Sequence, residues 1–159
     1  MKLNSNSILG FLNGIEGWAD PDAKESTPRP GLKVITIKKG NWTYMDQYAG
    51  GEPFQGLEIV WLKKVPVWSM SYRGFWNEGS DYKIMLKFVK KALQKPPKNA
   101  PWRGPKRFTI KDIPDWGYTN KWQGTIKEFN GLEKILFRGK VKGWTVYQGG
   151  IVNKKHINL

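Results

Sequence analysis

The sequence predicts an α+β fold: a duplicated antiparallel β-meander that forms a curved sheet or partial barrel, with a central helix between the two copies and a short N-terminal helix. Three observations predict this fold: a strand-rich segment that occurs twice, an amphipathic segment between the copies, and a length of 159 residues. A chain of this length can bury a core without disulfide bonds. We therefore expect residues 1–159 to form a single domain.

The repeated segment is FQGLEIVWLKKVPVWSMSYRG at residues 54–74 and FNGLEKILFRGKVKGWTVYQG at residues 129–149. Aligned without a gap, the copies share Phe54/Phe129, Gly56/Gly131, Leu57/Leu132, Glu58/Glu133, Tyr72/Tyr147 and Gly74/Gly149. A basic turn falls at the same offset in both, so each copy predicts one hairpin.

The duplication extends backwards by one strand, because Tyr48 precedes the first copy as Trp122 precedes the second. The repeat then covers approximately residues 42–74 and 118–149, with a three-stranded meander in each half. The glycine of each F-x-G-L-E predicts a bulge or tight bend. Glu58 and Glu133 follow at matching places, where each either accepts backbone N–H bonds or pairs with the other as acid and base across a cleft.

Apolar residues at helical spacing predict the N-terminal helix, with Ser7 as its N-cap: Ile8, Leu9, Phe11, Leu12, Ile15 and Trp18. Residues 20–31 predict a proline-rich connector, in which Pro28 and Pro30 hold Arg29 in an extended loop. Arg29 either pairs with a nearby acid or offers its guanidinium to a carboxylate or phosphate.

Residues 32–37 alternate as a strand, a KKGN turn follows, and residues 41–48 predict the next strand with Trp42, Tyr44, Asp46 and Tyr48 on one face. Burying a carboxylate among aromatic rings costs several kcal/mol unless it is hydrogen-bonded. Asp46 therefore either meets a cation or faces a wet cavity.

The central helix is expected at approximately residues 81–94, capped by Ser80 and ended before Pro96. Its core stripe is Met85, Phe88, Val89 and Ala92, and its basic face is Lys83, Lys87, Lys90 and Lys91. The basic face is either solvated or binds phosphate. After the helix, Trp102 and Arg103 in a proline-rich loop either stack on a base and bind a phosphate or cover the edge of the core.

Composition limits the chemistry that the chain can perform. The formal net charge of +14 favours anionic partners. With no cysteine and one histidine, His156 in a tail expected to be frayed, the chain offers no thiol catalysis, histidine triad or zinc site. Phosphate-loop motifs are absent, so we expect no cofactor and no metal. The short apolar run at the N-terminus predicts neither a signal peptide nor a membrane span, and hence a cytoplasmic protein.

Five motifs together resemble a known family: PRPG, WTYMDQYAGGEPFQGLE, VPVWSMSYRG, PWRGP and the final FNGLEKILFRG to YQGG. The chain resembles the bacterial domain-of-unknown-function family 5680, in matching order from Phe11 to about Ile151. Members of that family look like small free-standing proteins, or they follow a helix-turn-helix DNA-binding domain in regulators. We expect no such DNA-binding domain in this chain. The resemblance implies a sensor-like or ligand-binding role.

The leading hypothesis is a non-enzymatic binding protein for a small anionic ligand, such as a nucleotide or nucleotide-derived signal, with a sensor or sequestering role. Candidate ligand-binding residues are arginines on stiff loops with nearby aromatic and acidic residues: Arg29, Trp42, Tyr44, Asp46, Glu58, Trp68, Tyr72, Trp102, Arg103 and Glu133. No catalytic residue is assigned, and the sequence does not fix the oligomeric state.

Two alternatives come from other functional classes. The first is sequence-tolerant nucleic-acid binding through basic residues of the helix and loop: Lys83, Lys87, Lys90, Lys91, Lys106 and Arg107. The second is an enzyme that uses Glu58, Glu133 or Asp46 as acid and base. It ranks last because no nucleophile or metal cluster accompanies these carboxylates.

Overall fold

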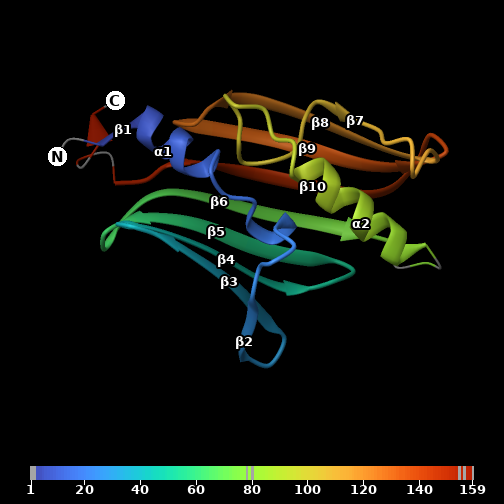
Figure 1. Ribbon diagram of the computed structural model, residues 1–159, viewed down its shortest axis with the longest axis horizontal. Coiled ribbons are helices and arrows are strands. Elements are labelled where there is room, and N and C mark those ends of the chain that lie inside the picture. Colours follow the sequence, from blue (N-terminus) through green and yellow to red (C-terminus); the bar gives the residue numbers. More distant parts are fainter. Residues whose placement is uncertain (1–2, 78, 80, 154, 156, 159) are drawn as a thin grey trace.

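Nine strands form one antiparallel sheet in the computed structural model, which describes residues 3–77, 79, 81–153, 155 and 157–158. The strand order is β2-β3-β4-β5-β6-β10-β9-β8-β7 (Figure 1). The bounds are β2 (Glu25–Arg29), β3 (Leu32–Lys39), β4 (Trp42–Gly50), β5 (Phe54–Leu62), β6 (Val65–Trp76), β7 (Arg107–Phe108), β8 (Trp116–Thr125), β9 (Glu128–Phe137) and β10 (Lys140–Ile151). The predicted α+β fold is confirmed, and the sheet is open rather than closed into a barrel.

Each copy of the repeat forms a three-stranded meander, β4-β5-β6 in the first half and β8-β9-β10 in the second. The halves join at the centre of the sheet, where β6 and β10 pair antiparallel with Tyr72 opposite Tyr147. Approximate two-fold symmetry therefore relates the halves about this central pair.

The duplication also includes elements that the sequence comparison did not reveal. Ile37 of β3 lies opposite Tyr44, and Phe108 of β7 lies opposite Tyr118, the counterpart of Tyr44. The helix α1 (Ser5–Leu12) precedes the first set of strands as α2 (Tyr82–Leu93) precedes the second. Each half is thus a helix, a loop and a run of antiparallel strands.

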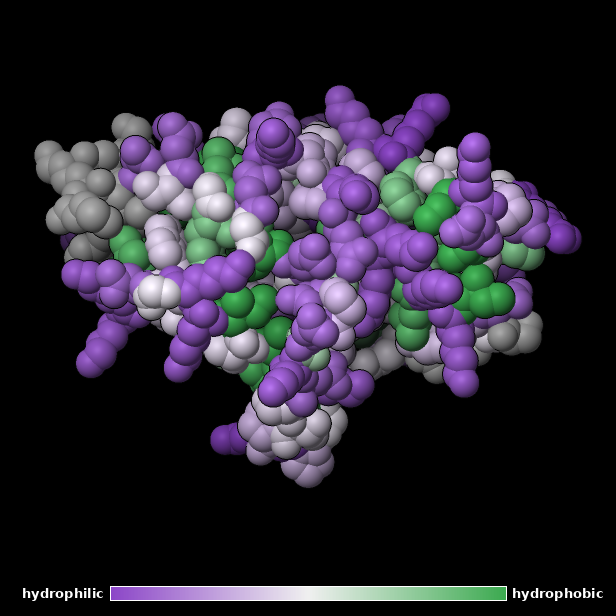
Figure 2. Space-filling view, in the orientation of Figure 1, coloured by the Kyte–Doolittle hydropathy of each residue, from purple (hydrophilic) through white to green (hydrophobic). Residues whose placement is uncertain are grey.

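Both helices and the short 3-10 turn η1 (Gly17–Ala19) lie on the same face of the sheet (Figure 1). The predicted core stripe of α2 is confirmed, because Met85, Phe88, Val89 and Ala92 are all buried. On α1, Ile8, Phe11 and Leu12 are buried. The main core therefore lies between the helices and this face, while the outer surface of the helix layer is mostly hydrophilic (Figure 2).

The ends of α1 differ from the prediction. Asn4 is the N-cap, and its side chain accepts a hydrogen bond from the Ser7 backbone N–H at 2.9 Å, whereas Ser7 lies inside the helix. The helix ends at Leu12, so Ile15 and Trp18 lie outside it. Three glycines between residues 10 and 17 explain the early end, since glycine is a poor helix former.

Two further segments are more ordered than predicted. The connector at residues 20–31 contains strand β2, with Pro28 inside it. Proline is tolerated there because β2 is an edge strand and need not donate on its open side. The tail was expected to be frayed, but β11 (Ile157–Asn158) pairs in parallel with β1 (Leu3–Asn4).

The sequence predicted Ser80 as the N-cap of α2 and placed the histidine His156 in the tail. Asp81 is the N-cap residue of α2 and makes no side-chain cap bond. The predicted cap Ser80 and the histidine His156 lie outside the described residues.

No helix in the described part of the chain has the length and apolar character needed to cross a membrane.

Candidate functional site

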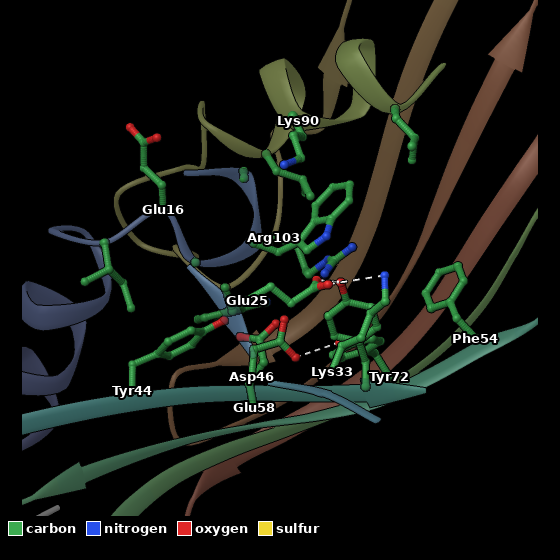
Figure 3. Close-up of a pocket in the computed structure, with 18 of the residues that line it drawn as sticks. Glu16, Glu25, Lys33, Tyr44, Asp46, Phe54, Glu58, Tyr72, Lys90 and Arg103 are labelled. Carbon is green, nitrogen blue, oxygen red and sulfur yellow. Dashed lines mark hydrogen bonds and ion pairs between the residues drawn. The ribbon is translucent and has the colours of Figure 1, made fainter. Parts of the chain in front are cut away.

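A cavity of about 510 Å³ lies between the helix layer and the first half of the sheet (Figure 3). Its floor comes from β4, β5 and β6, and its walls come from the segment after α1, from α2 and from residues 101–103. The lining includes several aromatic rings, among them Trp18, Tyr44, Phe54, Tyr72 and Trp76. The size suits a small organic molecule.

Two carboxyl groups lie side by side on the floor of the cavity. Asp46 on β4 and Glu58 on β5 are direct cross-strand neighbours, so their side chains project from the same face of the sheet (Figure 3). Asp46 is 3% exposed and Glu58 is 7% exposed. The Tyr72 hydroxyl donates a hydrogen bond to Asp46 Oδ1 at 2.7 Å, and the Tyr44 hydroxyl lies beside Glu58.

A glycine determines where Tyr72 points. Gly56 lies directly opposite Tyr72, and a Cβ built on Gly56 would lie 2.3 Å from the phenol ring. The ring therefore lies across the glycine and directs its hydroxyl at Asp46. The second half repeats this pair as Gly131 and Tyr147, with the same 2.3 Å approach. The predicted bulge at these glycines is absent, because the strand register runs through both without a shift.

Burial raises the pKa of both carboxyl groups. Loss of hydration raises the pKa of Asp46 to about 6, against an opposing effect of the Tyr72 hydrogen bond. Loss of hydration, followed by repulsion from Asp46, raises the pKa of Glu58 to about 8. Because adjacent carboxylates in a poorly hydrated site resist double ionisation, the pair holds about one proton at neutral pH.

The second half of the sheet contains a related set of side chains. Tyr147 donates to Asn120 Oδ1 at 2.7 Å, as Tyr72 donates to Asp46 at 2.7 Å in the first half. An uncharged amide thus occupies the position of the Asp46 carboxylate. Glu133 is the counterpart of Glu58 and lies directly opposite Asn120.

Glu133 is neutralised within the protein. Arg103 forms an ion pair and hydrogen bond with Glu133 Oε2, and the Tyr118 hydroxyl donates to Glu133 Oε1. The Arg103 side chain is 10% exposed, and its guanidinium also lies 5.8 Å from the centre of the Tyr72 ring. Among the described residues, by contrast, no lysine or arginine forms an ion pair with Asp46 or Glu58.

The loop that carries Arg103 is fixed by its neighbours. Trp102 is buried and stacks on Phe129, with ring centres 4.1 Å apart and planes inclined by 15°. Asn120 Nδ2 donates to the Gly104 carbonyl at 2.9 Å. Trp102 therefore belongs to the buried core and also lines the cavity.

A polar group lies at the edge of the cavity. Lys33 Nζ lies 3.2 Å from Glu25 Oε1 (Figure 3). The Tyr48 hydroxyl donates a hydrogen bond to Glu25 Oε2. On the opposite wall, Lys90 Nζ lies 4.7 Å from the centre of the Trp18 ring. The positive charges near the cavity are therefore already engaged by acidic or aromatic partners.

The candidate residues from the sequence divide into three groups. Those lining the cavity are Tyr44, Asp46, Glu58, Tyr72, Trp102 and Arg103. Glu133 lies behind Arg103 as its ion-pair partner. The others lie outside the cavity lining: Trp42 stacks on Phe11, Trp68 is fully buried, and Arg29 is exposed at the end of β2.

The basic residues do not gather at the cavity. Lys83 and Lys87 are exposed on α2, whereas Lys90 and Lys91 are half-buried. Lys106 lies over the Trp122 ring at 5.6 Å, and Arg107 is exposed on β7. In the described part of the chain, no three acidic or histidine side chains converge as metal ligands would.

Sequence patterns did not indicate several residues of the cavity, including Glu25, Lys33 and Trp76. A usable signal existed for Lys33, because it falls on the same face of β3 as Ile35 and thus on the face shared with Asp46. Trp76 lies beyond the end of the repeated segment, where comparison of the two copies gives no information.

A family model described as "Domain of unknown function (DUF5680)" matches residues 46–152. The chain belongs to this family. The DUF5680 match includes Asp46, Glu58, Arg103 and Glu133, and it begins later than the resemblance placed from Phe11. Comparisons with curated proteins and with solved structures found no match.

Proposed function

We propose that this chain is a non-enzymatic binding protein that holds a small organic cation in the cavity beside Asp46 and Glu58. The observation that carries the proposal is a pair of adjacent, buried carboxyl groups that face a cavity and have no ion-pair partner among the described residues. A positively charged nitrogen with N–H donors is the group that such a pair binds most strongly.

Charge balance within the site supports a cation. Arg103 forms an ion pair with Glu133, and its charge also lowers the pKa of Asp46 and of Glu58. The Asp46–Glu58 pair with one proton still leaves one negative charge in a poorly hydrated site. An unpaired buried charge is costly, so a cationic ligand stabilises this site and an anion adds repulsion. The aromatic walls favour the same sign, since ring faces attract cations.

The expectation of an anionic ligand rested on the net charge and on Arg29 and Arg103, and it stays a prediction. The cavity favours the opposite sign because Arg29 lies outside it and Arg103 is bound to Glu133. In addition, Arg103 Nε has no acceptor among the described residues and is almost inaccessible to solvent. This N–H is therefore not exposed to an anion in the cavity.

The same carboxyl pair supports a second candidate function. Two adjacent carboxyls that hold one proton provide an acid and a base in one apolar cavity, which is the arrangement used in acid–base catalysis. This candidate predicts that a bound ligand is recovered in altered form. Mass spectrometry of the ligand before and after incubation with the protein tests it.

The binding proposal is tested with benzylamine and benzoate, which share a phenyl body and carry opposite charge. We expect calorimetric titration at pH 8 to show one binding site for benzylamine and none for benzoate. Asp46→Asn and Glu58→Gln should each weaken benzylamine binding by about tenfold or more, because each removes a charge-assisted bond.

Glu128→Gln is the matched control, because it removes an exposed carboxylate on β9 outside the cavity lining. It should leave benzylamine binding unchanged. Tighter binding of benzoate than of benzylamine would reject the cation proposal and support the anionic hypothesis instead.

A further inference from the structure

We propose that the cationic group recognised in the cavity is a planar guanidinium or amidinium, because the protein already binds one at the matching position of its other half. This inference rests on the proposed function and specifies the chemical class of the ligand. The internal occupant is the side chain of Arg103.

The two positions correspond residue by residue. Glu58 has the strand position of Glu133, Tyr44 that of Tyr118, and Tyr72 that of Tyr147. Asp46 has the position of Asn120 and receives the equivalent tyrosine hydrogen bond, at 2.7 Å in both halves. Three of the side chains around each glutamate therefore correspond, with an amide in place of one carboxylate. The neighbour on the third strand differs, because Met70 lies opposite Glu58 and Thr145 lies opposite Glu133.

In the second half, the loop before the strands delivers the guanidinium. Gly104 packs against Tyr118 so closely that a Cβ on Gly104 would lie 2.5 Å from the Tyr118 hydroxyl. The preceding residue is Arg103, whose guanidinium bonds Glu133. Close packing of the glycine thus positions the arginine on the glutamate.

In the first half, the loop before the strands is built in the same way but delivers no cation. A Cβ on Gly17 would lie 2.8 Å from the Tyr44 hydroxyl, which matches Gly104 on Tyr118. The preceding residue is Glu16, an exposed side chain that accepts a hydrogen bond from Gln94 Nε2 at 3.2 Å. The first half therefore has the glutamate, both tyrosines and the glycine contact, and a cavity in place of the arginine.

A guanidinium also fits this floor better than an ammonium does. It presents five N–H donors in a rigid plane, which match two carboxyl groups side by side, whereas an ammonium is a compact point charge that is strongly hydrated. Asp46 in place of Asn120 provides the second carboxyl. The volume of about 510 Å³ leaves room for a body attached to the guanidinium.

The test compares benzylguanidine with benzylamine by calorimetric titration of the full chain. We expect one site for benzylguanidine with at least about tenfold higher affinity than for benzylamine. Glu58→Gln should abolish this preference, because it removes the counterpart of Glu133. The exposed-site variant Glu128→Gln should keep it.

The outcomes separate the two levels of the proposal. Equal or tighter binding of benzylamine would overturn the guanidinium inference and leave the cation-binding function standing. Binding of neither compound, or of benzoate alone, would overturn both. Should Glu58→Gln unfold, Tyr44→Phe is the second variant. It keeps the charge and should reduce benzylguanidine affinity less than Asp46→Asn does.

Discussion

At Asp46 and Glu58, the charge that would bind a cation conflicts with the burial of the side chain. Their ionised forms attract a cation, but the surrounding side chains exclude the water that would otherwise stabilise those forms. Burial therefore favours the neutral state of each carboxyl, and repulsion from Asp46 adds to this effect at Glu58. Deprotonating the pair is less favourable in the folded protein than in the unfolded chain. The stability of the protein should therefore depend on pH.

Stability should fall as the pH rises from 4.5 to about 8, the window between the ordinary and the raised pKa of Glu58. Within it the folded protein binds more protons than the unfolded chain, so the free energy of unfolding decreases with pH. A tenfold change in an acid constant corresponds to about 1.4 kcal/mol, so the loss amounts to a few kcal/mol. Urea unfolding at several pH values should show a flatter profile for Glu58→Gln. A profile as steep as that of the wild type would contradict this account.

Gly56→Ala should destabilise the protein by about 1–3 kcal/mol, because the new methyl group would displace Tyr72 and approach the Gln47 backbone carbonyl within 2.8 Å. Gly10→Ala in α1 is the control, since apart from its chain neighbours and the backbone of its own helix no atom lies within 4 Å of the added Cβ. This control should stabilise the protein by up to about 1 kcal/mol through helix propensity. Thermal unfolding of both variants measures the contrast, and similar shifts in both would refute the role assigned to Gly56.

At the scale of elements, the loop between α2 and β7 fills the second half of the sheet. Trp102 covers Phe129, Arg103 neutralises Glu133, and the Gly104 carbonyl accepts from Asn120. In the corresponding loop between α1 and β2, Gly17 packs against Tyr44 and Trp18 contacts Trp76, but the residue before the glycine is Glu16 rather than an arginine. The two halves therefore differ in the residue that each loop places before its glycine, and on the strands in Asp46 against Asn120.

Arg103→Met should cost about 3–5 kcal/mol of stability, because it leaves Glu133 buried without its counter-charge. The double variant Arg103→Met/Glu133→Gln should recover much of this loss, since no uncompensated charge remains. Urea unfolding of the two single variants and the double variant gives the coupling energy. Additive effects would mean that the pair does not act as a unit.

At the scale of the whole molecule, the repeat made the meanders and their central helix predictable, because strand and helix periodicity survive in local sequence. For Asp46 the sequence predicted either a cation or a wet cavity; Asp46 lines a cavity, and its hydrogen-bond partner is the Tyr72 hydroxyl. Glu58 and Glu133 were correctly placed at matching positions by the alignment alone.

Long-range contacts were not predictable in the same way. Arg103 and Glu133 are 30 residues apart in the chain, and nothing local selects Glu133 over Glu58 as the partner. Arg29 and Arg103 both lie in proline-rich segments, Arg29 between two prolines and Arg103 before a glycine. Arg29 is nevertheless exposed on an edge strand, whereas the Arg103 side chain is mostly buried. The pairing depends on how the two halves meet, which local patterns do not encode.

The most direct test of cation binding is the number of protons exchanged when benzylguanidine binds near pH 7. A cation beside Asp46 and Glu58 favours their ionised forms, so up to about one proton should be released per ligand. Calorimetric titration in buffers of different ionisation enthalpy measures this number. Proton release that disappears in Glu58→Gln is the predicted result, and proton uptake, or no exchange with binding intact, would contradict the claim that these carboxyls bind the ligand.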